Sequence, residues 1–339
     1  MWLNYVWFGL FVVIVAGYLI LDGFDLGVGI LHLSLARTDT ERRVLLNAIG
    51  PVWDGNEVWL VVTGGVLFAA FPMVYASLFS GFYIAMMFVL IFLIMRTVAI
   101  EFRSKRPGQG WRRVWDFWFF IASFGIALLL GVAIGNIIIG LPIDGQGNMA
   151  ITTLALLGPF PLMVGVTTVF MLAMHGCFYL AMKTEDDLHT RVLRYIPRLM
   201  LVFTLLMVVL VVWLFVGNFQ LAVNFKTLVW PIFIPVLALG VMLVAYRAFR
   251  QRHYFVAWVH SSLTILLLLG AVGFGLYPNL LISTIDPAYN LTIFNAASQP
   301  NVLTVMLVFA LIGMPFVLLY TASVYYIFRG HVVIGPRSY

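Results

Sequence analysis

Long apolar runs are the feature of this sequence that most limits what it can fold into. A helix that crosses the hydrocarbon core of a bilayer needs about 20 apolar residues. Nine stretches of the chain reach that length: Tyr5–Leu35, Val52–Phe71, Val74–Phe102, Trp115–Leu141, Thr152–Met182, Ile196–Gly217, Leu228–Ala248, Phe255–Leu281 and Val302–Phe328. Only 9% of the residues are charged, whereas a soluble domain carries roughly 25%. We therefore expect an all-α polytopic membrane protein with about nine transmembrane helices.

Cations alternate between the predicted loops and indicate an orientation. The first apolar run is too long for a signal peptide, so we expect it to be retained as a helix. Arginine and lysine cluster after the odd-numbered spans, at positions that include Arg37, Arg42, Arg43, Arg103, Lys105, Arg106, Arg112, Arg113, Lys183, Arg191, Arg194, Arg198, Arg247, Arg250, Arg252, Arg329 and Arg337. The intervening loops hold almost none, with Lys226 as the main exception. Because such residues are retained on the cytoplasmic side, we expect the N-terminus outside and the C-terminus in the cytoplasm.

The spacing of the spans predicts one integral membrane domain over residues 1–339. Within it, residues 1–141 would form a first four-helix bundle with the acidic residues, residues 152–281 a second bundle, and residues 302–328 a peripheral ninth helix. Prolines fit the first turn of a helix or the loop beyond it. Six of them punctuate the predicted ends: Pro51, Pro72, Pro142, Pro197, Pro278 and Pro300.

Two aspartates lie inside the first predicted span. Ionisable groups at membrane depth cost at least about 2.5–3.5 kcal/mol each. Asp22 and Asp25 are three residues apart, so they share a helix face. Gly23 and Gly27 lie beside them in a small-xxx-small pattern that lets another backbone come close. Either a proton-relay role or a structural hydrogen bond to a neighbouring helix would explain the two carboxyl groups.

A second acidic pair opens the second predicted span. Pro51 is expected to start this helix, which puts Asp54 in its first turn, where the helix dipole stabilises an anion. Glu57 lies one turn deeper on the same face, where the helix dipole does not explain well why a carboxylate is present. Two carboxylates that step inward from the cytoplasmic side suggest a route of proton uptake, and a simple charge effect at the helix end is the alternative for Asp54.

Arg96 is the deeply placed cation of the third predicted span, and it needs an anionic partner. Asp25, Asp54 and Glu57 lie at compatible depths. We interpret Arg96 as half of a structural ion pair that fixes helix register, with a role in transport as the alternative.

Glu101 ends the same span at the expected cytoplasmic interface. It can pair with Lys105 one helical turn later, or it can collect protons at the mouth of a channel. The early spans thus hold five carboxyl groups and one deep arginine, a balance that suits a proton route and not an anion route.

Three histidines, His32, His175 and His260, lie at membrane level. A haem held by two histidines needs ligands at matching depth on facing helices, and no histidine-pair spacing recurs along any predicted helix. Cys177 is the single cysteine of the chain, so no cysteine metal cluster is expected. We therefore predict no metal and no haem in this chain. The net charge of +6 belongs to loops, and no nucleic-acid partner is expected.

Several ordered motifs give the chain a family resemblance. It resembles subunit II of the bacterial cytochrome bd-type quinol oxidases at Asp22–Gly29, Trp53–Trp59, Phe68–Ala76, Ser80–Tyr83, Arg103–Lys105, Trp115–Asp116, Gly131–Asn136 and Leu319–Ala322. The first 140 residues match densely, and the rest matches mainly in its pattern of spans.

The resemblance implies a terminal oxidase of the bacterial inner membrane that oxidises quinol and reduces O2 to water. The expected partner is a larger subunit I that carries two b-type haems, one d-type haem and the quinol site. A small single-span accessory subunit and membrane lipid are further expected partners. In some relatives, subunit II also holds a structural quinone.

The resemblance also assigns roles to residues of this chain. Asp54 would belong to a proton path from the cytoplasm, Glu101 would stand at its mouth and Trp59 would line it. Asp25 and Arg96 would be the other polar positions of the family.

The chain departs from some relatives at two of its carboxylates. It has Glu57 where some relatives have glutamine, which adds a charge, so proton routing can differ in detail. It has Glu101 where some have aspartate, which keeps the carboxylate.

A proton-coupled secondary transporter is the alternative hypothesis, because carboxylates inside the membrane suit both functions. Such transporters often show broken helices and inverted repeats near the midplane, and the sequence shows no clear pair of these. Solute uptake by this chain reconstituted alone would favour the transporter.

Overall fold

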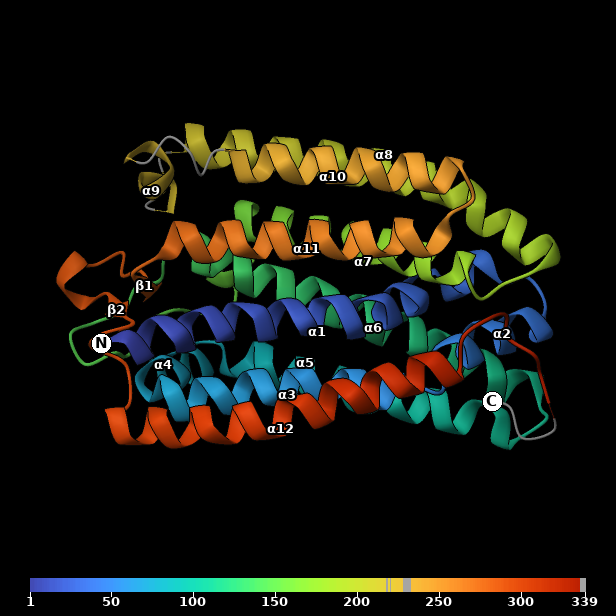
Figure 1. Ribbon diagram of the computed structural model, residues 1–339, viewed down its shortest axis with the longest axis horizontal. Helices are drawn as coiled ribbons and strands as arrows, with labels where there is room; N and C mark the ends of the chain where they lie inside the picture. The colour runs from blue at the N-terminus through green and yellow to red at the C-terminus, as the bar shows by residue number, and fades with distance from the viewer. Residues whose placement is uncertain (218, 220, 228–232, 336–339) are drawn as a thin grey trace.

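The computed structural model describes residues 1–217, 219, 221–227 and 233–335, and long helices that run along a common axis dominate it (Figure 1). In chain order the elements are α1 (Trp2–Leu35), α2 (Asp39–Ile49), α3 (Trp53–Ala70), α4 (Pro72–Gly81), α5 (Tyr83–Phe102), η1 (Arg103–Lys105), α6 (Gln109–Ile139), η2 (Ala155–Leu157), α7 (Pro159–Ala181), α8 (Asp186–Val216), α9 (Leu221–Thr227), α10 (Phe233–Arg250), α11 (Tyr254–Leu276), β1 (Asn279–Leu281), η4 (Pro287–Tyr289), β2 (Leu291–Thr292) and α12 (Pro300–Ile327).

The predicted all-α membrane architecture is confirmed. Within the described residues, eight helices are long and apolar enough to cross a membrane: α1, α5 with η1, α6, α7, α8, α10, α11 and α12. The second predicted span corresponds to α3, which is not among them because its first turns carry Asp54, Asn56 and Glu57. The count of nine spans and the sidedness of the chain remain predictions.

Three elements differ from the predicted boundaries. The run predicted as one helix over residues 74–102 is two helices, α4 and α5, which are separated at Phe82. Pro197 lies inside α8 and not at its start, because α8 extends past the apolar run through charged residues from Asp186 onward. Residues 39–49, expected as a loop, form the amphipathic helix α2. Residues 228–232 of the seventh predicted span lie outside the described residues, and its described part is α10.

Helix α1 is the centre of the bundle and packs against α3, α6, α7, α11 and α12. Helix α7 crosses α1 at a point where both helices have a glycine, as the small-xxx-small pattern of α1 predicts. A Cβ atom placed on Gly27 would lie 2.0 Å from the carbonyl oxygen of Leu172 on α7. A Cβ atom on Gly176 of α7 would lie 2.7 Å from the carbonyl carbon of Gly27. With α7 at this crossing and α3, α5 and α6 on the other sides, every residue of α1 from Asp22 to Gly29 is buried.

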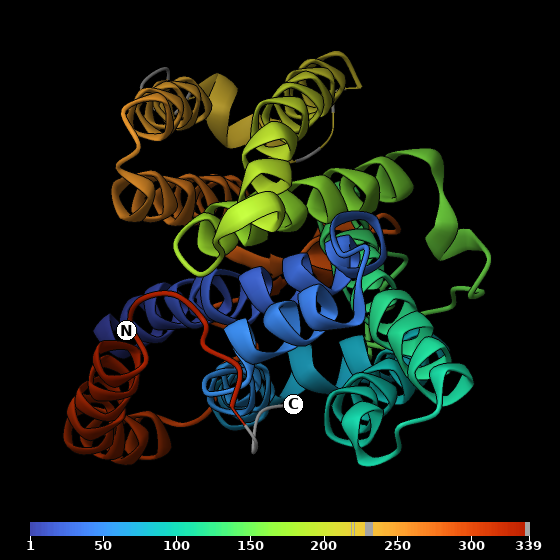
Figure 2. The ribbon, with the colours of Figure 1, turned by 90° about the vertical axis from the view of Figure 1, so that its right-hand side faces the viewer.

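The last helix, α12, lies on the outside of the bundle. Figure 2 shows it on the side opposite α8, α10 and α11, and it packs mainly against α1 and α3. Of its 28 residues only Leu303 is buried. The two-stranded sheet of β1 and β2, with Asn279 opposite Thr292, lies near the N-terminus of α1. The division into two four-helix bundles remains a prediction.

The other end of the bundle, where α1 and α5 end and α3 and α6 begin, is called here the arginine-rich end. Its buried or half-buried arginines include Arg42, Arg103, Arg112 and Arg191, which form ion pairs. It is the end predicted to face the cytoplasm.

Candidate functional site

A buried ion pair joins α5 to α1 within the bundle. Arg96 on α5 donates from Nη1 to Oδ2 of Asp22 at 2.8 Å, and its Nη2 donates to the other oxygen of the same carboxylate. Both side chains have 0% exposure. The pair is bidentate, which is the geometry that best compensates two charges for the loss of water.

The structure corrects the partner expected for Arg96. The sequence favoured Asp25, Asp54 and Glu57, but the direct partner is Asp22. Glu57 Oε2 lies 3.9 Å from Arg96 Nη2, a long ion pair without a hydrogen bond. Asp22 and Asp25 are on one face of α1, so sequence depth alone could not separate them.

A second chain of hydrogen bonds begins one turn further along α1. Asp25 is fully buried, and its Oδ2 accepts a hydrogen bond from Nδ2 of Asn56 on α3 at 2.7 Å. Asn56 Oδ1 in turn accepts one from the hydroxyl of Tyr325 on α12 at 3.0 Å. The chain therefore links α1, α3 and α12. Sequence analysis missed Asn56 and Tyr325, because a neutral amide and an aromatic residue do not stand out in an apolar run.

Polar atoms of this region that are buried without a hydrogen-bond partner among the described residues include Asp25 Oδ1, Glu57 Oε2 and Arg96 Nε. Most buried polar atoms of proteins are hydrogen-bonded to protein or to ordered water. Unused hydrogen-bonding capacity is thus concentrated where the acidic side chains meet. Together, Asp22, Asp25, Glu57, Arg96, Asn56 and Tyr325 are called here the central cluster.

Of the other predicted residues, Asp54 and Glu101 lie towards the arginine-rich end, and Trp59 lies one turn further along α3 than Asn56. Asp54 occupies the first turn of α3, as predicted, and its side chain is exposed on the isolated chain. Glu57 is one turn deeper, with 21% of its side chain exposed. Trp59 is half-buried, and its ring fills the space that Gly17 of α1 leaves open. Glu101 is half-buried in the last turn of α5. Among the carboxyl groups of α3, exposure therefore falls from Asp54 to Glu57.

A separate ionic network, unexpected from the sequence, lies at the arginine-rich end. Asp116 on α6 is buried and accepts hydrogen bonds from His32 Nε2 at 2.6 Å, Arg42 Nη1 at 2.6 Å and Arg103 Nε at 2.5 Å. Arg103 also bonds Asp39 at 2.8 Å. The partners of Asp116 come from α1, α2 and η1, so the network ties these elements to α6.

Glu41 fastens α2 to the rest of this end. Its carboxylate accepts from the backbone N–H of Arg37 and of Thr38, completing a capping box at the start of α2, and it also pairs with Arg191 of α8. Burial acts to raise the pKa of Glu41, but the hydrogen bonds outweigh it, and the pKa lies below its ordinary value of 4.5.

Each of the membrane-level histidines makes at least one hydrogen bond within the chain. Nε2 of His175 donates to the carbonyl oxygen of Ile20 at 3.0 Å, and Nδ1 lies 2.6 Å from Ser261 Oγ. Binding of iron would break one of these contacts. His32 bonds Asp116, and Nδ1 of His260 donates to a carbonyl of its own helix at 2.7 Å. Within the described residues, no group of three or more His, Cys, Asp or Glu is arranged to hold a metal ion.

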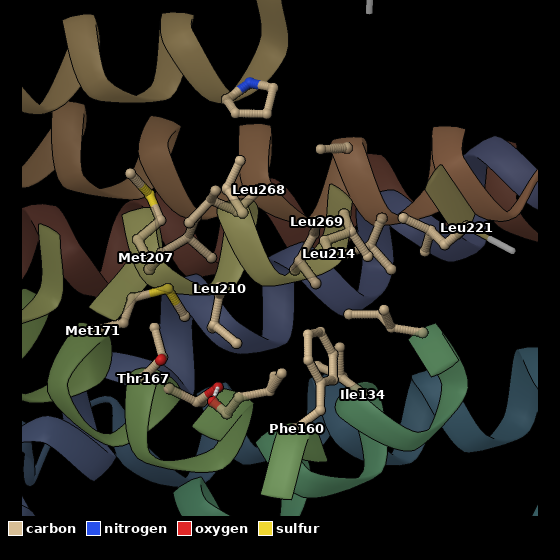
Figure 3. Close-up of a pocket in the computed structure, with 18 of the residues that line it drawn as sticks. Ile134, Phe160, Thr167, Met171, Met207, Leu210, Leu214, Leu221, Leu268 and Leu269 are labelled. Carbon is tan, nitrogen blue, oxygen red and sulfur yellow. Dashed lines mark hydrogen bonds between the residues drawn. The ribbon is translucent and has the colours of Figure 1, made fainter. Parts of the chain in front are cut away.

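The described residues also line a partly open apolar cavity of about 160 Å³ on the other side of α1. Figure 3 shows side chains from α6, α7, α8 and α11 that line it, among them Ile134, Phe160, Leu214 and Leu269. The hydroxyl group of Thr167, which is labelled in Figure 3, donates a hydrogen bond to a carbonyl oxygen of its own helix. The lining thus suits a hydrocarbon group and offers little to a polar one.

Comparisons with known proteins give one consistent result. Residues 3–328 match the family model described as cytochrome bd terminal oxidase subunit II. The chain is 37% identical to cytochrome bd-I ubiquinol oxidase subunit 2 of Escherichia coli strain K12, over 97% of this chain and 95% of that protein. It is 34% identical to cytochrome bd ubiquinol oxidase subunit 2 of Bacillus subtilis strain 168, over 97% of each.

The fold has a counterpart among solved structures. A chain of the bd oxidase from Geobacillus thermodenitrificans superposes with a TM-score of 0.77 at 17% identity, covering 96% of this chain and 97% of that one. At that identity the match concerns the fold alone.

Proposed function

Because the chain belongs to the cytochrome bd terminal oxidase subunit II family, we propose that it contributes a proton-uptake path to a membrane complex that oxidises quinol and reduces O2 to water. Its partner in this proposal is a haem-bearing subunit I. Reduction of O2 to water consumes protons as well as electrons, so a buried oxygen-reducing site needs a route by which protons reach it.

The proposed path runs inward along α3. It begins at Glu101 and the exposed Asp54, enters the central cluster at Glu57, and ends at Asp25 of α1, with Trp59 beside it. The observation that carries it is the stepwise burial of carboxyl groups, from exposed Asp54 through half-buried Glu57 to fully buried Asp25. Intramembrane carboxyl groups in such a series are the usual elements of proton relays.

The charge balance of the central cluster supports transfer of protons and not only structural pairing. Its carboxyl groups are Asp22, Asp25 and Glu57, and its one cation is Arg96. Asp22 takes the bidentate contact, while Asp25 is bonded to a neutral amide. Because an unbalanced charge at this depth is costly, Asp25 and Glu57 are carboxyl groups that can carry a proton and release it.

The exposed position of Asp54 supports a protein partner on this side of the chain. The same face of α3 exposes the apolar Val58, Val61 and Phe68. A carboxylate near the membrane boundary normally faces protein or a water-filled space and not lipid. Subunit I packed against this face would cover Asp54 and receive protons from the path.

The haems of the proposed complex belong to subunit I, and when bound there they supply the redox chemistry of quinol oxidation and O2 reduction. The apolar cavity of Figure 3 would accept the isoprenoid tail of a structural quinone, because its lining is apolar over several helices. The transporter hypothesis has no support from the comparisons.

Replacement of Asp54 by asparagine in the complete complex tests the proposed path. Removal of a proton-carrying group typically slows a reaction by about a hundredfold or more, so we expect O2 consumption with quinol to fall at least roughly tenfold if slower bypass routes exist. The matched control is Asp187→Asn, which removes another exposed acid from the first turn of a long helix.

Haem content of the purified complex separates a slow enzyme from a poorly assembled one. Equal haem content, a slow Asp54→Asn enzyme and an unaffected control would support the path. Turnover of Asp54→Asn at the level of the unsubstituted complex would refute it.

A further inference from the structure

Helix α12 contacts the central cluster through one side chain, although most of the helix is exposed. Tyr325, in its last turn, is half-buried and donates its hydroxyl hydrogen to Asn56 Oδ1 at 3.0 Å. Its ring also lies edge-on to Phe24 of α1, with the centroids 6.3 Å apart. The next residue, Tyr326, is exposed and stacks with Arg329 instead.

The Asn56 amide is held between the hydroxyl of Tyr325 and the carboxyl group of Asp25. An asparagine side chain presents a carbonyl acceptor on one side and an NH2 donor on the other. Because the hydroxyl of Tyr325 bonds the oxygen, the NH2 group is directed at Asp25 Oδ2, 2.7 Å away. If this hydroxyl were lost, the amide could rotate and present its oxygen to Asp25.

A fold of the C-terminal tail holds this turn of α12 in place. The backbone N–H of Val332 donates to the carbonyl of Lys183, and Lys183 Nζ donates to the carbonyl of Phe328, at 3.0 Å and 2.5 Å. His331 pairs with Glu185. Figure 2 shows the tail leaving the end of α12 and crossing this end of the bundle. The tail therefore ties the last turn of α12 to the turn between α7 and α8.

We propose that Tyr325 is a positioning residue that acts on Asp25 through Asn56 and so sets the hydrogen-bonding state of the innermost carboxyl group of the path. The proposal rests on the proposed function, because it gives Asp25 a part in proton transfer. Tyr325 itself carries no proton along the path: its hydroxyl orients the amide, and the amide hydrogen-bonds the carboxyl group.

The test is the pH profile of quinol oxidation by the complete complex carrying Tyr325→Phe. This substitution keeps the ring against Phe24 and removes only the hydroxyl. Loss of one buried hydrogen bond corresponds to roughly half a pH unit to one pH unit in the midpoint of a titration, and we expect a displacement of that size in a limb of the profile. The matched control is Tyr326→Phe, which should leave the profile unchanged.

Two further measurements distinguish positioning from general destabilisation. First, Tyr325→Phe added to an Asn56→Ala complex should displace the profile no further, since the link is already broken. Second, the infrared carboxyl band of the purified complex that Asp25→Asn removes should change frequency in Tyr325→Phe but not in Tyr326→Phe. Both results together would support an action through Asn56.

Each contrary outcome has its own meaning. A profile and a carboxyl band that Tyr325→Phe leaves unaltered, in a complex that Asp54→Asn still slows, would overturn the positioning role and leave the proposed function standing. Additive displacement in the double variant would also overturn it, as would failure of Tyr325→Phe alone to assemble. If Asp54→Asn has no effect either, the proposed function is the part that fails.

Discussion

Replacement of Arg96 by methionine should destabilise the protein severely, because it strands a buried carboxylate. Arg96 and Asp22 both have 0% exposure and share two hydrogen bonds. Removal of one partner of a buried ion pair costs about 3–5 kcal/mol. Asp22 can limit the loss by taking up a proton, so we expect a value near the lower end. A loss of about 3 kcal/mol is still a hundredfold or more in the folded-to-unfolded ratio.

The decisive comparison is with the double variant Asp22→Leu/Arg96→Met. Replacement of a whole buried ion pair by well-packed apolar residues is often neutral or stabilising. The double variant should therefore be more stable than Arg96→Met alone, even though it carries more substitutions. Glu57, the other carboxylate near Arg96, is partly exposed and depends less on the guanidinium.

The assay is thermal unfolding of the purified complex in detergent, followed by intrinsic fluorescence, together with the yield of haem-containing complex from equal amounts of membrane. Two results would contradict this account. If Arg96→Met unfolds at the same temperature as the unsubstituted protein, the ion pair contributes nothing to stability. If the double variant is no more stable than Arg96→Met, the loss of stability comes from altered packing and not from an unpaired charge.

Two other predictions concern packing and pH. Gly27→Ala should destabilise the protein by about 1–3 kcal/mol through overpacking, because the added Cβ atom would lie 2.0 Å from the backbone of Leu172. The control is Gly9→Ala on the same helix. Its added Cβ atom would have nothing within 4 Å, so this variant should be neutral in the same thermal assay. The pKa of Glu41 is depressed below 4.5, so its bonds to Arg191 and the start of α2 stabilise the protein above that pH and are lost as the pH falls through the lower folded value. Glu41→Gln should thus melt at a lower temperature than the parent at neutral pH, and the difference should vanish in strong acid; a constant difference across the pH range would contradict this.

The parts of the fold that depend on hydropathy and on energetic cost could be predicted from the sequence. Apolar length located most of the helices, and Gly27 identified where another backbone approaches α1. The need of Arg96 for a buried partner also followed from its depth. The identity of that partner did not, because the rotation of α1 decides between Asp22 and Asp25, and packing with α7 sets that rotation.

Other features were missed for different physical reasons. The motif Thr38-Asp39-Thr40-Glu41 is a capping box and could have identified α2. The Asp116 network had no comparable signal, since its partners on α1 and α2 are 84 and 74 residues away in the chain. The role of Tyr325 could not be predicted for the same reason, since it is 269 residues away in the chain from its partner Asn56.

The geometry of one helical turn explains why a path on α3 can join an exposed surface to a buried cluster. Successive residues of a helix are turned by about 100°, so Asp54 and Asn56 lie roughly 200° apart, on nearly opposite sides of α3. Asp54 accordingly faces outward while Asn56 reaches Asp25 inside. Glu57 falls between them, which fits its intermediate exposure and its 3.9 Å approach to Arg96. Asp54→Asn and Tyr325→Phe would therefore perturb the same turn from opposite sides, the first by removing the proposed proton carrier and the second by releasing the Asn56 amide.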